Sequence, residues 1–380
     1  MAPQSLPIEL LEKIVQNADR AELRALSCAS CTFKSITEPV LYNSIAELGF
    51  RSTVHAILSV LRPGCEYRQG YVRKFSINTL AWAQRAKPEL LQGFFRLVAQ
   101  ALESFVKLDE LYLLGLPPSE AWVLGRCTAQ PIAFVTDIPP GQVLSSWLER
   151  QRRMEVLVLA NKYMAHWDEH VQVSSSALPN LRLVCAKSNT LQSLIPDRPV
   201  SRVVLDFTLD NKGDGSAYED LKTAFASSAR PVHTLGIHFR PAPRNNYITS
   251  DLPMFVNKDA RLLDAVTFLD IHVPTFRLFD AFCDIAKTVE TCPNLSRVCV
   301  TGRNPPFDSE CDLKENSQRW HDRSSSLSWT EFREPEGRSR RFALDKPSGK
   351  MVPAPVADVA VGADAEYEYY SALFQAVLRG

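Results

Sequence analysis

The first fifty residues carry apolar side chains at the spacing of short amphipathic helices. One set comprises Leu10, Leu11, Ile14, Val15 and Ala18, and a second comprises Leu23, Leu26, Ala29, Ser30 and Phe33. Residues that recur at i, i+3, i+4 and i+7 share one helix face. Pro7 suits the first turn of a helix, and Asp19 with Glu22 three residues later predicts a capping box. So short a segment cannot bury a core of its own, so we expect two or three helices that pack on another surface.

The remaining chain contains short apolar runs that predict β-strands. They lie at 72–77, 108–113, 132–135, 156–159, 181–184, 203–207, 232–237, 266–271 and 295–300. They recur every ~22–36 residues, which is typical of a repeat array. Helical patterns lie between several of them, at 88–105, 139–153 and 274–291, and a further helix is expected at 55–61. Strand and helix in alternation predict an α/β fold with a parallel sheet and the helices outside it.

The repeat pattern ends near residue 300. Alternating apolar and polar residues at 327–332 and 341–344 predict a closing hairpin, and the composition of 346–365 predicts a flexible linker. Apolar residues at helical spacing in 366–378 predict a helix that caps the array. The expected organisation is therefore a helical domain at 1–50, a connecting helix and loop at 51–70, an array at 71–345, and a linker with a capping helix at 346–380.

Composition and charge exclude several classes of protein. Of the 380 residues 45% are hydrophobic and 23% charged, with 43 basic and 43 acidic side chains. A balanced charge gives no bulk attraction to nucleic acid or to an anionic membrane, so neither is expected as a partner. The basic cluster at 338–341 follows Glu331, Glu334 and Glu336, which predicts a solvated polar face. No signal peptide or membrane helix is expected, and we predict a cytoplasmic or nuclear protein.

The candidate chemical sites are weak. Nine irregularly spaced cysteines predict reduced, mostly buried thiols, with Cys299 in the core of its strand. Cys28 and Cys31 form C-x-x-C inside the predicted second helix, without the strand context of a redox motif. His166 and His170 lack the order of a metalloprotease motif, and 210–215 lacks the ligands of a calcium loop. Phosphate-binding glycine motifs are absent as well. We therefore expect no metal, no cofactor and no enzymatic activity.

The N-terminal pattern resembles an F-box of the kind common in fungal proteins. The matching sequence is Leu6-Pro7-x-Glu9-Leu10-Leu11-x-x-Ile14, Leu23-x-x-Leu26-Ser27, Phe33, and Pro39-x-Leu41-Tyr42. The resemblance implies helices that dock the Skp1 adaptor of cullin-RING ubiquitin ligases. The implied adaptor-binding residues are Leu6, Pro7, Glu9, Leu10, Ile14, Leu23, Leu26, Ser27 and Phe33. Some of them must pack internally, and the sequence does not sort which. The alternative is a helical hairpin that only packs on its own domain.

Some of the predicted repeats resemble leucine-rich repeats. Leu181-x-x-Val184-x-Ala186-x-x-Asn189 follows the full pattern with substitutions, and Leu108-x-x-Leu111-x-Leu113 follows its first half. The resemblance implies an irregular solenoid in which Asn189 bonds backbone groups where the chain turns. The alternative is an unrelated α/β fold with several parallel strands.

Together the two resemblances imply the substrate-recognition subunit of an SCF-type (Skp1–cullin–F-box) ubiquitin ligase. The F-box would dock Skp1 and through it a cullin, and the array would bind an unidentified protein target for ubiquitin-dependent degradation. The alternative is a leucine-rich-repeat scaffold or protein-interaction module that works outside any ligase.

Overall fold

The computed structural model describes residues 6–46, 49–80, 82–83, 86–160, 171–208, 223–240, 264–273, 285–286, 289–290, 292–302, 310–333 and 339–354. The chain is an α/β protein with mostly parallel strands. It divides into two compact units, one made largely of residues 1–154 and the other largely of 155–379. Within the described ranges, no helix combines the length and the apolar character that crossing a membrane requires.

Three short helices open the first unit: α1 (Ile8–Asn17), α2 (Arg20–Ala29) and α3 (Cys31–Leu41). The predicted capping box is confirmed, because the Asp19 carboxylate accepts from the Glu22 N–H at 2.9 Å and the Glu22 carboxylate from the Asp19 N–H at 2.7 Å. The second apolar set does not form one helix as predicted. Ser30 is extended and its hydroxyl accepts from the Phe33 N–H, so a new helix begins there. The C-x-x-C pair therefore spans the α2–α3 junction.

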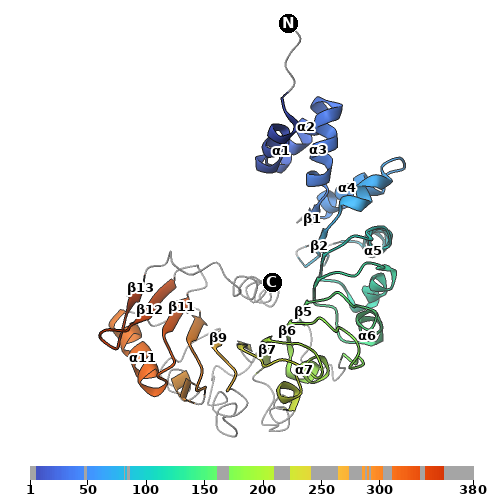
Figure 1. Cartoon of the computed structure of the whole chain (residues 1–380). Coiled ribbons are helices and arrows are strands. Elements are labelled where there is room, and N and C mark those ends of the chain that lie inside the picture. Colours follow the sequence, from blue (N-terminus) through green and yellow to red (C-terminus); the bar gives the residue numbers. More distant parts are fainter. Residues whose placement is uncertain are drawn as a thin grey trace. The chain divides into compact units, whose positions relative to one another are not determined.

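Parallel strands follow the helices in the first unit. They are β1 (Ser44–Ala46), β2 (Lys74–Asn78), β3 (Glu110–Leu114) and β4 (Ala133–Thr136), each paired with the next. The helices are α4 (Phe50–Leu61), η1 (Glu66–Tyr71), α5 (Pro88–Ser104), η3 (Pro118–Arg126) and α6 (Gln142–Leu148), with α5 and α6 on one side of the strands (Figure 1). Buried aromatic pairs join strand and helix layers: Phe75 lies 5.3 Å from Phe105 and Phe134 lies 4.6 Å from Trp147, between ring centroids.

The second unit continues the same scheme. Its strands are β5 (Val156–Leu159), β6 (Leu183–Lys187), β7 (Arg202–Thr208), β8 (Thr234–Arg240), β9 (Phe268–Val273), β10 (Arg297–Gly302), β11 (Trp329–Arg333), β12 (Ser339–Asp345) and β13 (Lys350–Ala354). The strands from β5 to β11 pair in parallel, and β12 and β13 add antiparallel neighbours. The helices α7 (Ser188–Leu194) and α11 (Glu310–Arg323) lie outside the strands (Figure 1).

All nine predicted strands are present as β2 to β10, and the predicted hairpin is β11 and β12. The predicted helices at 55–61, 88–105 and 139–153 are confirmed as α4, α5 and α6. The linker prediction is wrong for Lys350–Ala354, which forms β13 because β12 offers it an edge to pair with. The helices predicted at 274–291 and 366–378 lie largely or wholly outside the described residues, as do His166, His170 and 210–215.

Polar side chains bond the backbone where strands β2 to β4 end. The Asp137 carboxylate accepts from the Gly115 N–H at 2.8 Å, and the Thr136 hydroxyl donates to the Leu113 carbonyl at 2.9 Å. Asn189 was expected to play this part, but it lies in the first turn of α7 and accepts from the Thr190 hydroxyl. Asp137 and Thr136 therefore supply in the first unit the kind of bond that was expected of Asn189.

A substitution at Gly115 tests whether the turn after β3 requires glycine. Its φ is +75°, and a Cβ there would lie 2.6 Å from the Leu80 nitrogen. Gly115→Ala should lower the free energy of unfolding by on the order of 3 kcal/mol, through left-handed strain and overlap. Gly93, exposed in the middle of α5 with open space around its Cβ position, is the matched control. Gly93→Ala should stabilise by about 1 kcal/mol. Urea denaturation measures both, and an unchanged midpoint for Gly115→Ala contradicts the prediction.

Candidate functional site

Helix α1 and the residue before its N-cap expose large aliphatic side chains. Leu6 is 55% exposed, Leu10 46% and Ile14 44%. Leu10 and Ile14 are four residues apart on α1, so they lie one above the other, and Leu6 lies two residues before the helix begins. We call these three residues the exposed apolar strip. Single exposed apolar residues are common on proteins, but Leu10 and Ile14 on α1, with Leu6 just before the helix, form an apolar patch of the kind that marks interaction sites.

The neighbouring stripe of the same helix is buried. Leu11 is 8% exposed and Val15 1%, and α1 packs on α3. Because the two stripes are adjacent, the apolar residues of α1 cover much more of its circumference than its own packing uses. One stripe holds the three-helix unit together, and the exposed apolar strip is left for another surface.

The structure sorts the remaining predicted site residues by exposure. Pro7 is the N-cap of α1, and both it and Glu9 are exposed. Leu23 is buried, so it belongs to the internal packing of α2. Leu26, Ser27 and Phe33 are partly exposed, and the Ser27 hydroxyl donates to the Arg24 carbonyl within its own helix. The predicted site residues thus divide into an exposed group on α1 and just before it, and a more buried group on α2 and α3.

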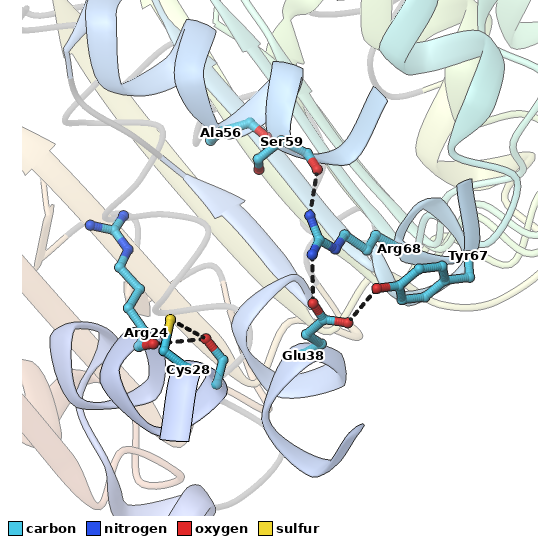
Figure 2. A network of polar contacts seen from close by, with 8 residues as sticks. Arg24, Cys28, Glu38, Ala56, Ser59, Tyr67 and Arg68 are labelled. Carbon is cyan, nitrogen blue, oxygen red and sulfur yellow. Dashed lines mark hydrogen bonds and ion pairs between the residues drawn. The ribbon is translucent and has the colours of Figure 1, made fainter. Parts of the chain in front are cut away.

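A buried ion pair fastens the end of α3 to the segment that follows. The Arg68 guanidinium donates to the Glu38 carboxylate at 2.6 Å and to the Ser59 carbonyl at 2.9 Å, as Figure 2 shows. The Tyr67 hydroxyl donates to the other Glu38 oxygen at 2.8 Å. The Glu38 side chain is 7% exposed and that of Arg68 14%. We call Glu38, Tyr67 and Arg68 the joint, because it links α3, α4 and η1.

The electrostatics of the joint follow from this geometry. The bond to the Glu38 carboxylate, followed by burial, raises the pKa of the Tyr67 phenol above its ordinary value. The Arg68 guanidinium also lies over the Tyr42 ring, 4.8 Å from its centre. Glu38 and Arg68 are 30 residues apart in sequence, so no local motif could have indicated their contact.

A second charged cluster lies in the second unit, around Glu331 on β11. Its carboxylate accepts from Arg297 at 3.2 Å, from Arg333 at 2.8 and 2.9 Å, and from Arg341 at 3.0 Å. The Glu331 side chain is 0% exposed. The prediction of a solvated polar face around Glu331 and 338–341 is therefore wrong for Glu331 and Arg341. Strand pairing sets Glu331, which is buried, opposite Arg341, whose side chain is mostly buried.

Burial alone would raise the pKa of Glu331. The hydrogen bonds and charges of Arg333 and Arg341 outweigh that effect and hold the pKa below its ordinary value. Arg333 responds in the opposite sense: desolvation would lower its pKa, but the anionic groups around it hold the pKa above its ordinary value. Glu331 therefore stays ionised inside the cluster, which needs the carboxylate to neutralise its guanidinium groups.

The cysteines are free thiols at all seven positions that the structure describes. Cys28 and Cys31 are exposed at the α2–α3 junction, and Cys299 is buried in β10 as predicted. Burial raises the pKa of the Cys127 thiol to about 11 and that of Cys299 well above its ordinary value. Among the described side chains, no three His, Cys, Asp or Glu residues are grouped as a metal site would need.

Comparison with known proteins assigns no family. No known protein family and no curated protein matches the chain. A solved structure that resembles part of it is ribokinase from Giardia lamblia, with 11% identity over 46% of this chain and 66% of the ribokinase chain. The TM-score of 0.19 is too low for this likeness to carry an argument about fold or activity.

The burial of the joint predicts that removing one of its two charges lowers the free energy of unfolding substantially. Glu38→Ala leaves the guanidinium of Arg68 buried without its counter-ion, so unfolding should become easier by on the order of 3–5 kcal/mol. The double change Glu38→Leu with Arg68→Met removes both charges and should recover most of that loss. Glu103→Ala, which breaks an exposed pair with Arg126, is the control and should cost less than about 1 kcal/mol. Chemical denaturation of the wild type and the three variants measures this, and equal losses for Glu38→Ala and Glu103→Ala contradict the prediction.

The lowered pKa of Glu331 predicts that the stability of the fold depends on pH. Its folded pKa lies below the ordinary carboxyl value. The stabilisation is therefore fully present above the unfolded pKa of about 4.3 and is lost as pH falls through the folded pKa. At pH 7 Glu331→Gln should be less stable by about 2 kcal/mol, the size of a hydrogen bond between charged groups. The two stability curves, measured by denaturation from pH 7 to pH 3, should converge in acid. A constant difference across that range contradicts the assignment.

Proposed function

We propose that the chain is the substrate-recognition subunit of a Skp1–cullin–F-box ubiquitin ligase. In this proposal residues 1–50 are the F-box and the strands and helices that follow form a leucine-rich-repeat-like array. The observation that carries it is the exposed apolar strip of Leu6, Leu10 and Ile14, which coincides with the motif positions and takes no part in buried packing. The ordered, sequential strand pairing of each unit supports the array part.

The exposed apolar strip has the character of a docking surface for an adaptor. Burying a large aliphatic side chain contributes roughly 1.5–3 kcal/mol, so three of them supply the core of a specific contact. An amphipathic helix that lays its apolar face into a groove is a recurrent recognition mode, and its anchors stand at helical spacing as these do. Glu9, exposed in the first turn of α1, would lie at the polar rim of such a contact.

The joint gives the proposed complex its geometry. It ties the end of α3 to η1 and α4, which lead directly into β2. An adaptor held on α1 would therefore be held at a defined angle to the first strands. In this proposal the chain catalyses nothing itself and acts by bringing adaptor and target together.

Changing the exposed apolar strip should abolish adaptor binding without affecting the fold. Leu10→Glu with Ile14→Glu removes two apolar contacts and places two charges in the interface. A loss of at least 3 kcal/mol corresponds to a dissociation constant raised about 100-fold or more. Both side chains are exposed in the free chain, so the thermal midpoint should hardly change. Gln16→Glu, exposed on the opposite side of α1, is the matched control and should bind normally.

The measurement is a titration of each purified chain with recombinant Skp1, beside its melting curve. Equal affinities for the wild type and the double variant would show that the exposed apolar strip is not the interface. A wild-type chain that is folded and binds no Skp1 would instead favour a repeat scaffold that works outside a ligase.

A further inference from the structure

Basic side chains gather around one carboxylate at the edge of the first unit where its parallel strands begin. Arg73 directly precedes β2, and Asp109 directly precedes β3. The Asp109 carboxylate lies 3.8 Å from the Arg73 guanidinium and 3.3 Å from that of Arg153. The Arg73 guanidinium also donates to the Lys107 carbonyl at 3.2 Å. One acidic side chain is thus shared by two arginines, with a lysine beside them.

Hydrogen bonds along the same edge bring Arg150 to this cluster. The Ile132 N–H donates to the Asp109 carbonyl at 2.7 Å. Two residues earlier, the Gln130 side-chain amide donates to the Arg150 carbonyl at 3.0 Å, and its oxygen accepts from the Arg152 N–H at 2.7 Å. We call five residues the basic edge: Arg73, Lys107, Asp109, Arg150 and Arg153.

The basic edge carries more positive than negative charge. Its side chains are accessible: Arg73 is 44% exposed, Arg153 55% and Asp109 32%, and Lys107 and Arg150 are exposed as well. Among the described residues, no carboxylate lies within ion-pair distance of the Lys107 ammonium or the Arg150 guanidinium. Four positive charges therefore surround one negative charge, and this surplus attracts an anionic partner.

The neighbouring charged residues do not cancel the surplus, because they contribute equal numbers of each sign. Arg126 lies 3.7 Å from Glu103, and Lys74 lies 2.7 Å from Glu110. Glu149 and Arg152 add one charge of each sign. The excess is therefore local to the basic edge, although the whole chain has 43 basic and 43 acidic side chains.

An exposed apolar side chain stands beside these charges. Val106 directly precedes Lys107 and is 63% exposed, more than any other large apolar side chain in the described ranges. Its N–H donates to the Ser104 carbonyl at 3.1 Å, in the turn that follows α5, and the preceding Phe105 is buried. An apolar contact with a charged surround is the usual anatomy of a protein interface.

These features favour an acidic protein segment over a nucleic acid. A protein that binds a nucleic-acid backbone contacts roughly six to ten phosphates, more than four basic side chains offer. The Asp109 carboxylate between Arg73 and Arg153 would also repel a phosphate. An extended acidic peptide fits better, because carboxylates bond guanidinium groups in pairs and a side chain between them can cover Val106. From β2 to β5 is three strand spacings, about 15 Å, which about five extended residues span.

We infer that the basic edge and Val106 form a docking surface for an acidic segment of a partner protein. The carboxylates of that segment lie beside Lys107, Arg150 and the arginines that flank Asp109, and one of its apolar residues covers Val106. The inference rests on the proposed function only in calling this partner the target of the ligase. Peptide binding is measured without Skp1, so its failure is distinguishable from a failure of adaptor binding.

The test uses the full-length chain and a fluorescein-labelled peptide of about ten glutamates with one leucine at the centre. Fluorescence anisotropy at about 0.15 M salt, where weak long-range attraction is screened, gives the affinity. Lys107→Glu with Arg150→Glu should weaken binding by about tenfold or more, because it sets like charges opposite one another. Both side chains are exposed, so melting curves should show an unchanged fold.

The matched control makes the same change in net charge elsewhere on the first unit. Lys34 on α3 and Arg51 on α4 are exposed, and Lys34→Glu with Arg51→Glu should keep the wild-type affinity. Val106→Ser should weaken binding of the leucine peptide several-fold. It should not change the affinity for a peptide in which serine replaces that leucine.

A change at Asp109 should produce a gain that unfolding cannot imitate. The Asp109 carboxylate competes with the peptide for Arg73 and Arg153, so Asp109→Asn should tighten binding several-fold. An affinity that is unchanged or weaker would show that the peptide does not bind at these arginines.

Three further results would overturn the inference. One is a folded wild-type chain that does not bind the peptide. Another is an equal loss in the Lys107→Glu, Arg150→Glu variant and in the Lys34→Glu, Arg51→Glu control, which would mean that only net charge matters. The third is an oligothymidylate of the same length that binds more tightly than the peptide and is lost in the first variant, which would assign the surface to nucleic acid.

Discussion

Pairing of each strand with its neighbour in the sequence is the constraint from which the rest of the structure follows. Parallel neighbours cannot be joined by a tight turn, so each connection must cross over outside the sheet. In the second unit this leaves one sheet face for helices and the other for polar chemistry. Thr330 and Phe332 therefore meet α11, while Glu331 and Arg333, one residue away, meet charged neighbours on the opposite face.

Buried carboxylates mark the places where the chain must hold a particular geometry. Glu38 is bonded by Arg68 and Tyr67, and Glu331 by three arginines. Removing a charge from water is costly, and only close, well-directed partners offset that cost. Alternative arrangements of α3 against η1, or of β10 to β12, would leave these charges without such partners. The two clusters thus favour one arrangement over its competitors.

The sequence predicts elements whose signal is local and misses those that depend on a distant partner. β5 has the predicted bounds because Val156–Leu159 is an apolar run buried on both faces. β13 was not predicted because the segment that contains Lys350 and Pro353 has the composition of a linker. It forms a strand because it pairs with β12. The break between α2 and α3 at Ser30 was not predicted because the helical spacing of apolar residues continues across it. The contacts of Glu38 and Glu331 were not predicted because strand register and tertiary packing, not the spacing of residues in the sequence, bring the arginines to them.

For the candidate site, the motif predicted which residues belong to it but not which of them face solvent. On α1 the spacing of Leu10 and Ile14 is the same as that of Leu11 and Val15, so periodicity alone cannot tell a docking stripe from a packing stripe. The packing of α1 on α3 distinguishes the two stripes, because it buries Leu11 and Val15 and leaves Leu10 and Ile14 exposed. The exposed apolar strip and the joint share no residue. The surface that would set affinity for an adaptor is therefore separate from the contact that would set its orientation, and each can change in evolution without altering the other.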